Sequence, residues 1–111
     1  MKEKEIQKAV AEALNYSSAV WFHCPNERDV PVKRMVSLKR QGLQSGVPDC
    51  IICSLANNGK PSALEIKAEG NTPTDNQRRW LNQLSHAGWN ANWTAGLDES
   101  LMQLRDWNYL Q

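Results

Sequence analysis

The chain has few cysteines, little net charge and no long apolar run, and each of these shortages excludes a class of protein. Three cysteines in 111 residues are too few, and odd in number, for the disulfide framework of a small secreted domain. No apolar run is long enough to cross a membrane. The first residues mix lysine with glutamate and do not form a signal peptide. We therefore expect an intracellular protein without a membrane partner.

A length of 111 residues suits one domain with its own core, and we expect a single domain over residues 1–111. The formal net charge of +1 neither favours nor excludes nucleic acid as a partner. The distribution of charge is more informative, because residues 31–48 contain four cations and no acid: Lys33, Arg34, Lys39 and Arg40. Such a run is a candidate for contacts with DNA phosphates, and ordinary solvated helix charges are the alternative.

The cysteines do not form a strong zinc pattern. Cys50 and Cys53 form a CxxC, and His23 with Cys24 could complete a set of four ligands. The CxxC lies inside a strand-like run, however, so that its two side chains should point to opposite faces. Buried structural cysteines are therefore the preferred interpretation, and a zinc-stabilised adaptor is the alternative.

Apolar periodicity and turn residues predict alternating helices and strands. We expect helices over residues 2–15, 33–41 and 75–87, and a last helix that Asp98 caps and that reaches Leu110. Strand-like runs cover residues 18–23, 49–55, 62–67 and 90–95, with a loop at 24–31 and an Asn58-Gly59 hairpin signal between the second and third runs. This order predicts an α/β fold, in which helices flank a central mixed β-sheet on both sides.

Charged residues in two of these strands point to chemistry. Alternation places Glu65 and Lys67 on one face of their strand, and Asp49 opens the preceding strand. If Asp49 lies beside Glu65, either one carboxyl holds a proton or a cation lies between the two. Carboxylate oxygens favour Mg²⁺ or Mn²⁺. Lys67 would add a positive charge for a phosphate oxyanion, and these parts suit metal-assisted phosphodiester hydrolysis.

The register of the hairpin tests this hypothesis. A strict two-residue turn at the Asn-Gly pair would put Asp49 opposite Ala68, facing away from Glu65. One extra loop residue or a bulge would put Asp49 opposite Lys67 instead. The metal hypothesis therefore requires an odd-length loop or a bulge within residues 50–62. The alternative is that Asp49 caps a turn, while Glu65 and Lys67 form an exposed ion pair on an edge strand.

Five segments resemble, in order and at plausible spacing, the VRR-NUC family of the PD-(D/E)xK nuclease superfamily: WFHCPNE at 21–27, GVPD at 46–49, EIK at 65–67, DNQRRWL at 75–81 and HAGWNANW at 86–93. The resemblance covers nearly the whole chain. It implies a restriction-endonuclease-like fold and Mg²⁺- or Mn²⁺-dependent endonucleolytic cleavage of DNA. It also implies a homodimer that acts on duplex or branched DNA, similar to Holliday-junction resolvases, in the cytoplasm of a bacterial or phage-infected cell.

The resemblance assigns roles to individual residues. It implies that Asp49 and Glu65 bind the metal, that the backbone carbonyl of Ile66 also reaches it, and that Lys67 is the catalytic lysine. It gives Gln77 a supporting role in the site. The sequence offers two interpretations of Gln77, which lies on the inward face near the start of its helix but also completes a capping box with Thr74. We prefer the site.

Related nucleases also place an acid from the first helix near the metal, and the candidates here are Glu3, Glu5 and Glu12. Glu3 precedes Ile6 by three residues and Val10 by seven, so that it continues the inward apolar stripe. Glu5 and Glu12 lie on another face. The string EKEIQ also resembles the opening of the family. We therefore expect Glu3 to be the first-helix ligand, with a solvated terminal charge as the alternative.

Two functions of different classes remain open at this point. The first is a metal-dependent DNA endonuclease. The second is a module with a nuclease-like fold that binds branched or duplex DNA without cutting it. We prefer the nuclease, because a module that only binds has no need of clustered carboxylates, which would repel phosphates in the absence of a metal.

Overall fold

The computed structural model describes residues 1–24 and 31–111. The described chain forms helices α1 (Glu3–Tyr16), α2 (Val32–Arg40), α3 (Asp75–His86) and α4 (Leu97–Asp106), and strands β1 (Trp21–His23), β2 (Cys50–Ile52), β3 (Ser62–Lys67) and β4 (Asn90–Ala95). The strands form one sheet in the order β1-β2-β3-β4, in which β3 and β4 are parallel and the other pairs antiparallel. The predicted α/β fold with a mixed sheet is confirmed.

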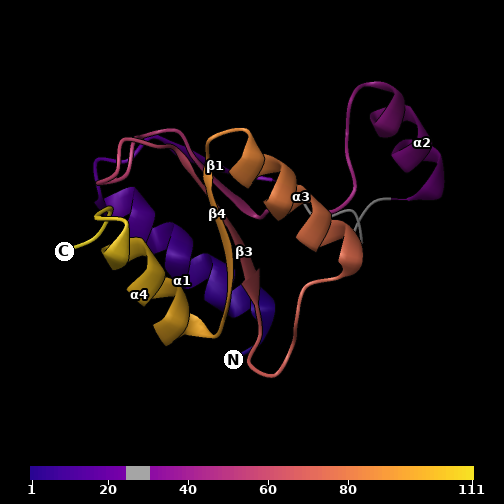
Figure 1. Ribbon diagram of the computed structural model, residues 1–111. Helices are drawn as coiled ribbons and strands as arrows, with labels where there is room; N and C mark the ends of the chain where they lie inside the picture. The colour runs from indigo at the N-terminus through magenta and orange to yellow at the C-terminus, as the bar shows by residue number, and fades with distance from the viewer. Residues whose placement is uncertain (25–30) are drawn as a thin grey trace.

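Helices cover both faces of this sheet. Figure 1 shows α1 and α4 side by side on one face, with α3 on the other. On the inner face of α1, Ile6, Val10 and Leu14 recur at helical spacing and are fully buried. They pack in one core cluster with apolar side chains of β2 and β3, namely Ile52, Leu64 and Ile66. No described helix is long and apolar enough to span a bilayer.

The order of elements explains why α3 lies where it does. The parallel strands β3 and β4 cannot be joined by a tight turn and need a crossover, which α3 provides. Since Leu64 and Ile66 face the core cluster, alternation turns Glu65 and Lys67 toward the α3 side. The two charged residues therefore lie on the opposite face of β3 from the core cluster.

Helix α2 stands apart from the rest of the molecule. None of its residues is buried, and Figure 1 shows it projecting beyond the start of α3. Its attachment to the body is specific at Asn76, whose side chain donates a hydrogen bond of 2.8 Å to the carbonyl of Ser45. Gly46, which follows Ser45, has a φ of +83°, and a Cβ at this position would lie 3.0 Å from Asn76. The conformation and the close approach both require glycine.

The predicted hairpin differs from the observed one. The strand expected over residues 49–55 ends at Ile52, so that nine residues, not two, join it to Ser62. Asn58-Gly59 does lie in a tight turn, in which the amide of Gly59 donates to the carbonyl of Ala56 over 2.9 Å. The chain beside that turn bonds to the end of α4 instead of extending the ladder, since Asn57 donates to the carbonyls of Asp106 and Trp107.

The last helix also begins and ends earlier than expected. It starts at Leu97 after Gly96, whose φ is +91°, and Asp98 lies in its first turn, so that the predicted Asp98 cap is wrong. Asp98 still stabilises the helix as an acid near the positive end of the dipole. The helix ends at Asp106, so that Leu110 packs against the core from beyond it. The loop predicted at 24–31 lies largely outside the described residues.

Candidate active site

The register of β2 and β3 brings the two candidate carboxylates together. Cys50 pairs with Leu64, so that one step further along the antiparallel ladder Asp49 lies opposite Glu65. The nine-residue loop has the odd length that the metal hypothesis requires, although the partner of Asp49 is Glu65 and not the expected Lys67. A carboxylate oxygen of Asp49 accepts a hydrogen bond of 2.8 Å from the amide of Ile66, which fixes the carboxyl against β3.

Burial excludes the interpretation of Glu65 and Lys67 as an exposed ion pair on an edge strand. Strand β3 lies inside the sheet, and the two residues are only 2% and 4% exposed. The Nζ atom of Lys67 lies 3.8 Å from Glu65 Oε2 and 3.9 Å from Glu3 Oε1. A buried ammonium group is therefore placed between an acid of β3 and an acid of α1.

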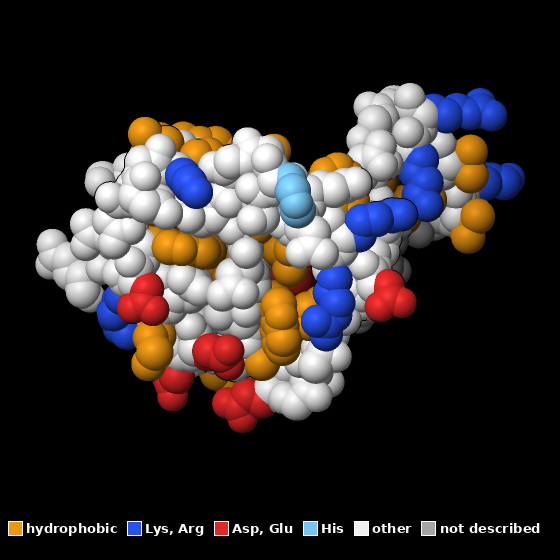
Figure 2. All heavy atoms as spheres, viewed as in Figure 1, with side chains coloured by type: hydrophobic (Ala, Val, Ile, Leu, Met, Phe, Trp, Pro, Cys, Tyr) orange, Lys and Arg blue, Asp and Glu red, His pale blue; other side chains and the backbone are white. Residues whose placement is uncertain are grey.

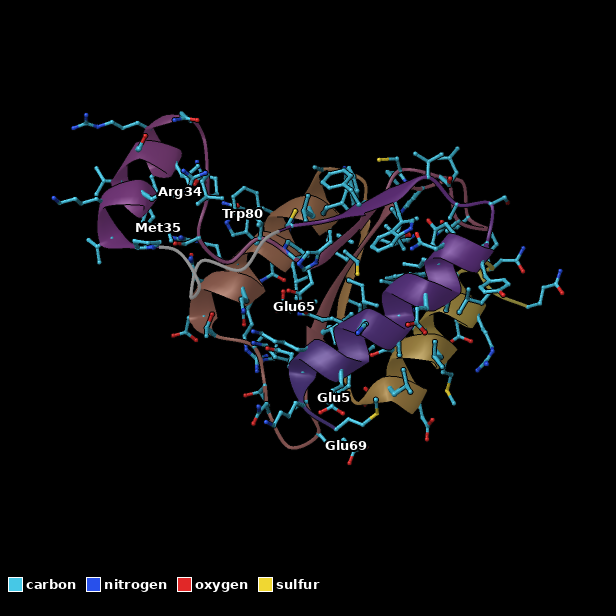
Figure 3. All side chains as sticks on the ribbon, turned by 180° about the vertical axis from the view of Figure 1, so that it is seen from behind. Glu5, Arg34, Met35, Glu65, Glu69 and Trp80 are labelled. Carbon is cyan, nitrogen blue, oxygen red and sulfur yellow. The ribbon has the colours of Figure 1, made fainter. Side chains whose placement is uncertain are left out.

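Burial and mutual repulsion disfavour ionisation of both facing carboxyl groups. Burial, reinforced by the neighbouring Asp49 carboxyl, raises the pKa of Glu65 to about 9. Burial also raises the pKa of Asp49, against the stabilising hydrogen bonds from Ile66 and from Glu65. Without a metal, Glu65 thus holds a proton at neutral pH and can donate a hydrogen bond to the Asp49 carboxyl. Figure 3 shows Glu65 in the interior between α1 and α3, in contrast to Glu5 on the outside of α1.

This arrangement fits a divalent cation. Oε1 of Glu65 is buried and has no hydrogen-bond partner among the described residues, which is costly for a polar atom unless a ligand completes the site. The carbonyl of Ile66 points to the same strand edge as its amide, toward Asp49. The described residues contain no cluster of three or more His, Cys, Asp and Glu side chains that could hold a metal. Two carboxylates, a carbonyl and waters are, however, a set that suits Mg²⁺.

The three acids of α1 differ in their relation to this cluster. Glu3 is half-buried and reaches Lys67, whereas Glu5 and Glu12 are exposed. The inward stripe of the helix explains the difference, because Glu3 lies one turn before the buried Ile6. Glu3 is therefore the α1 acid that the fold brings to the cluster, and it contacts the lysine.

Gln77 lies at the start of α3 but its oxygen is used for capping. The side-chain oxygen of Gln77 accepts a hydrogen bond of 2.9 Å from the amide of Thr74, and the Thr74 hydroxyl accepts one of 3.2 Å from the amide of Gln77. This is the capping box that the sequence offered as the alternative. None of the hydrogen bonds of Gln77 goes to Asp49, Glu65 or Lys67. The amide nitrogen of Gln77 remains outside the cap.

The predicted phosphate-binding cations lie away from the carboxylates. All four belong to α2 and are exposed: Lys33, Arg34, Lys39 and Arg40. Figure 2 shows lysine and arginine side chains gathered on the projection that α2 forms. The structure thus separates a buried, acidic cluster from an exposed, basic helix.

His23 and Cys24, at the end of β1, lie beside the cluster. The ring Nδ1 of His23 lies 3.1 Å from the backbone oxygen of Asp49, and the amide of Cys24 donates to the same oxygen over 2.8 Å. Burial, followed by the charges of Asp49 and Glu65, raises the pKa of the Cys24 thiol. The positions of His23 and Cys24 depend on the pairing of β1 with β2, which places His23 opposite Cys50. This pairing could not be predicted from the sequence.

The CxxC does not form a metal site. Cys50 is 3% exposed and packs in the core cluster, whereas Cys53 is exposed. The two thiols therefore lie on different sides of the chain, as strand alternation predicts. Cys53 is thus not one of the buried structural cysteines that the sequence analysis favoured.

Comparison with known proteins agrees with the geometry. The model of the VRR-NUC domain family matches residues 1–96. A solved structure described as a VRR-NUC domain protein aligns with a TM-score of 0.78 and 24% identity, over 99% of this chain and 90% of that one. Another, described as a VRR-NUC domain, gives 0.65 and 19%, over 98% and 99%. At these identities the structures show a shared fold. Among curated proteins, none matches the chain significantly.

Proposed function

This chain belongs to the VRR-NUC domain family, and on that premise we propose that it is a metal-dependent endonuclease that hydrolyses phosphodiester bonds of DNA. Membership makes it nuclease-like and a candidate for interaction with DNA. The observation that carries the finer proposal is the buried pair of Asp49 and Glu65 beside Lys67, with one Glu65 oxygen that has no partner among the described residues. Such a group is expensive to maintain unless it binds something.

We propose that Mg²⁺ or Mn²⁺ is held by Asp49, Glu65 and the carbonyl of Ile66, with Glu3 as the ligand from α1. When bound, this metal polarises the scissile phosphate and lowers the pKa of an attacking water. Lys67 holds its ammonium group beside the same carboxylates, where it can neutralise charge that develops on a phosphate oxygen. Low exposure of the cluster strengthens these interactions by excluding water.

Gln77 and α2 complete the proposal. The amide nitrogen of Gln77 lies outside the capping box, at the start of α3, where it can orient water or substrate. The four cations of α2 would contact the phosphates of DNA on either side of the cut. A chain with one such site cuts both strands of a duplex or a junction most simply as a two-fold dimer, and branched DNA is the substrate that we propose.

Metal dependence gives the first test. We expect wild-type protein to cut labelled four-way junction, flap or duplex DNA with Mg²⁺ or Mn²⁺, and not with EDTA. Asp49→Asn keeps an oxygen that can accept from Ile66 but removes the negative charge, so that cleavage should fall at least about a hundredfold. Asp98→Asn in α4 is the matched control and should cut normally. Tight DNA binding without cutting in either metal would instead establish the non-cleaving DNA-binding module.

The proposed dimer makes a separate prediction. Strand β1 lies at the edge of the sheet and carries Phe22, which is 52% exposed, next to the exposed Val20. An aspartate in place of Phe22 should convert a dimer into a monomer, because it would bury a charge in an apolar contact. Light scattering after gel filtration measures this, with Met102→Asp on α4 as an equally exposed control. A monomeric wild type, or a Phe22→Asp dimer, would contradict the proposed interface.

A further inference from the structure

The charges of the protein are segregated although their sum is only +1. Residues 31–48 and α3 together contain six cations and one acid, a local charge of +5: Lys33, Arg34, Lys39, Arg40, Arg78, Arg79 and Asp75. In the view of Figure 2, most acidic side chains lie on the lower part of the body, over α4 and the N-terminal end, and one lies near the start of α3. Most basic side chains lie over α2 and the neighbouring part of α3, and a few lie on the opposite part of the body. The basic surface is therefore larger than α2 alone.

A shallow, open depression runs along the outward face of α3. Polar side chains line it over the length of the helix: Asp75, Arg78, Arg79, Asn82, Gln83 and His86. Its two arginines are held by neutral neighbours, since the guanidinium group of Arg78 lies 5.9 Å above the ring of Trp93 and that of Arg79 donates to the side chain of Asn76. Within the described part of the chain, neither arginine forms an ion pair. Both are thus positioned, exposed cations.

Asn76 links this face to the basic helix. The same side chain that accepts from Arg79 donates to the carbonyl of Ser45, at the base of α2. The close approach of Gly46 to Asn76 fixes that base against α3. The arginines of α3 and the cations of α2 are therefore held on elements that are joined at one point, with Asp75 as the one acid of α3 beside it.

We propose that Arg78 and Arg79 form a second phosphate-binding surface on α3, which is continuous with α2 through Asn76 and binds the backbone of duplex DNA. A cationic surface that spans α2 and α3 matches an extended polyanion, because its two parts can contact phosphates at different places along it. A small anion would contact only one of them. The proposal deepens the proposed function, since it rests on DNA as the substrate.

The test measures binding of a labelled 30-base-pair duplex and of a four-way junction, in EDTA, over a series of salt concentrations. In Arg78→Gln/Arg79→Gln, the Kd should rise about tenfold or more, and the slope of log K against log salt should become shallower by about two units, as expected for two lost phosphate contacts. The matched control, Lys8→Gln/Arg105→Gln, removes two exposed cations from α1 and α4 and should leave both quantities unchanged. Equal Kd and slope in the two double variants would overturn the proposal.

A third variant tests the continuity with α2. Asn76→Ala keeps every cation but removes the contacts of this side chain with Ser45 and with Arg79, so that affinity should fall about threefold or more while the salt slope stays that of the wild type. Unchanged affinity would overturn the continuity.

The outcomes for the two proposals are distinguishable. If the wild type cuts DNA with metal but the α3 double variant binds DNA as the wild type does, the proposed second surface is contradicted and the proposed nuclease function is supported. If DNA binding depends on Arg78 and Arg79 but no DNA is cut in either metal, the second surface is supported and the nuclease function is contradicted. If the wild type does not bind DNA, both the nuclease function and the second surface are contradicted.

Discussion

Replacing Lys67 by methionine is expected to reduce DNA cleavage at least about a hundredfold, and to change the Kd for DNA by less than about twofold. Methionine preserves most of the buried volume, so that the loss isolates the charge of Nζ. That charge lies 3.8 Å from Glu65 and 3.9 Å from Glu3, inside the sheet and away from the exposed cations of α2. Single-turnover cleavage with Mg²⁺ and anisotropy in EDTA measure the two quantities separately.

Lys60→Met is the control for this experiment, because Lys60 is an exposed lysine on the loop before β3. Circular dichroism of both variants checks that Lys67→Met still folds with two acids that have lost a neighbour. If Lys67→Met cut at more than about a tenth of the wild-type rate, Lys67 would not act on the reacting phosphate, because removal of one such donor usually costs a hundredfold or more. A parallel loss of binding would place Lys67 in DNA recognition instead.

The central part of the fold could be predicted from local patterns. The bounds of β3 and β4 are those expected from the sequence, and α3 ends one residue before its predicted end. In each case the local signals agree with the tertiary environment: β3 is buried along its whole length, and α3 starts at a complete capping box. The crossover between two parallel strands then leaves little freedom for the topology.

Elements whose limits depend on distant partners were predicted less well. Strand β2 is three residues long, and the chain after it donates to the carbonyl of Val20 and then bonds to the end of α4, about fifty residues away in sequence. The start of α4 is set by Gly96 and not by the acid two residues later. No local pattern contains the position of another element, so that sequence periodicity overestimates a strand that tertiary contacts shorten.

The same distinction applies to the site. Strand alternation gave the shared face of Glu65 and Lys67, and helical periodicity selected Glu3 among three acids. The alternation of strand residues showed that an odd-length loop is needed to bring Asp49 onto the face of Glu65. The actual length of nine residues could not be predicted. The contacts of His23 with Asp49 and of Asn76 with Ser45 depend on β1 pairing and on the path of the chain around α2. They required the structure.

Glu65→Gln is expected to stabilise the protein in the absence of metal, although it should abolish metal-dependent cleavage. The pKa of Glu65 is about 9 in the folded chain, against an ordinary value of 4.5. Between these values the folded state holds a proton that the unfolded state has released, so that the free energy of unfolding falls as pH rises through this window, and is greatest below it. The glutamine amide can donate to Asp49 as the protonated acid does, but it cannot ionise. At pH 8.5 the variant should therefore unfold at least about 5 °C higher than the wild type.

The control for this prediction is Glu5→Gln, which removes an exposed acid of α1 and should follow the wild-type pH dependence. Thermal unfolding in EDTA between pH 5 and pH 8.5 measures the effect, and a wild-type profile as flat as that of Glu65→Gln would contradict a raised pKa of Glu65. Addition of Mg²⁺ or Mn²⁺ completes the test. A cation that takes the place of the proton should raise the unfolding temperature of the wild type most at high pH, where the pair is most strained, and should leave Glu65→Gln unchanged. A structural charge pair without affinity for metal would show the pH dependence but no response to either ion.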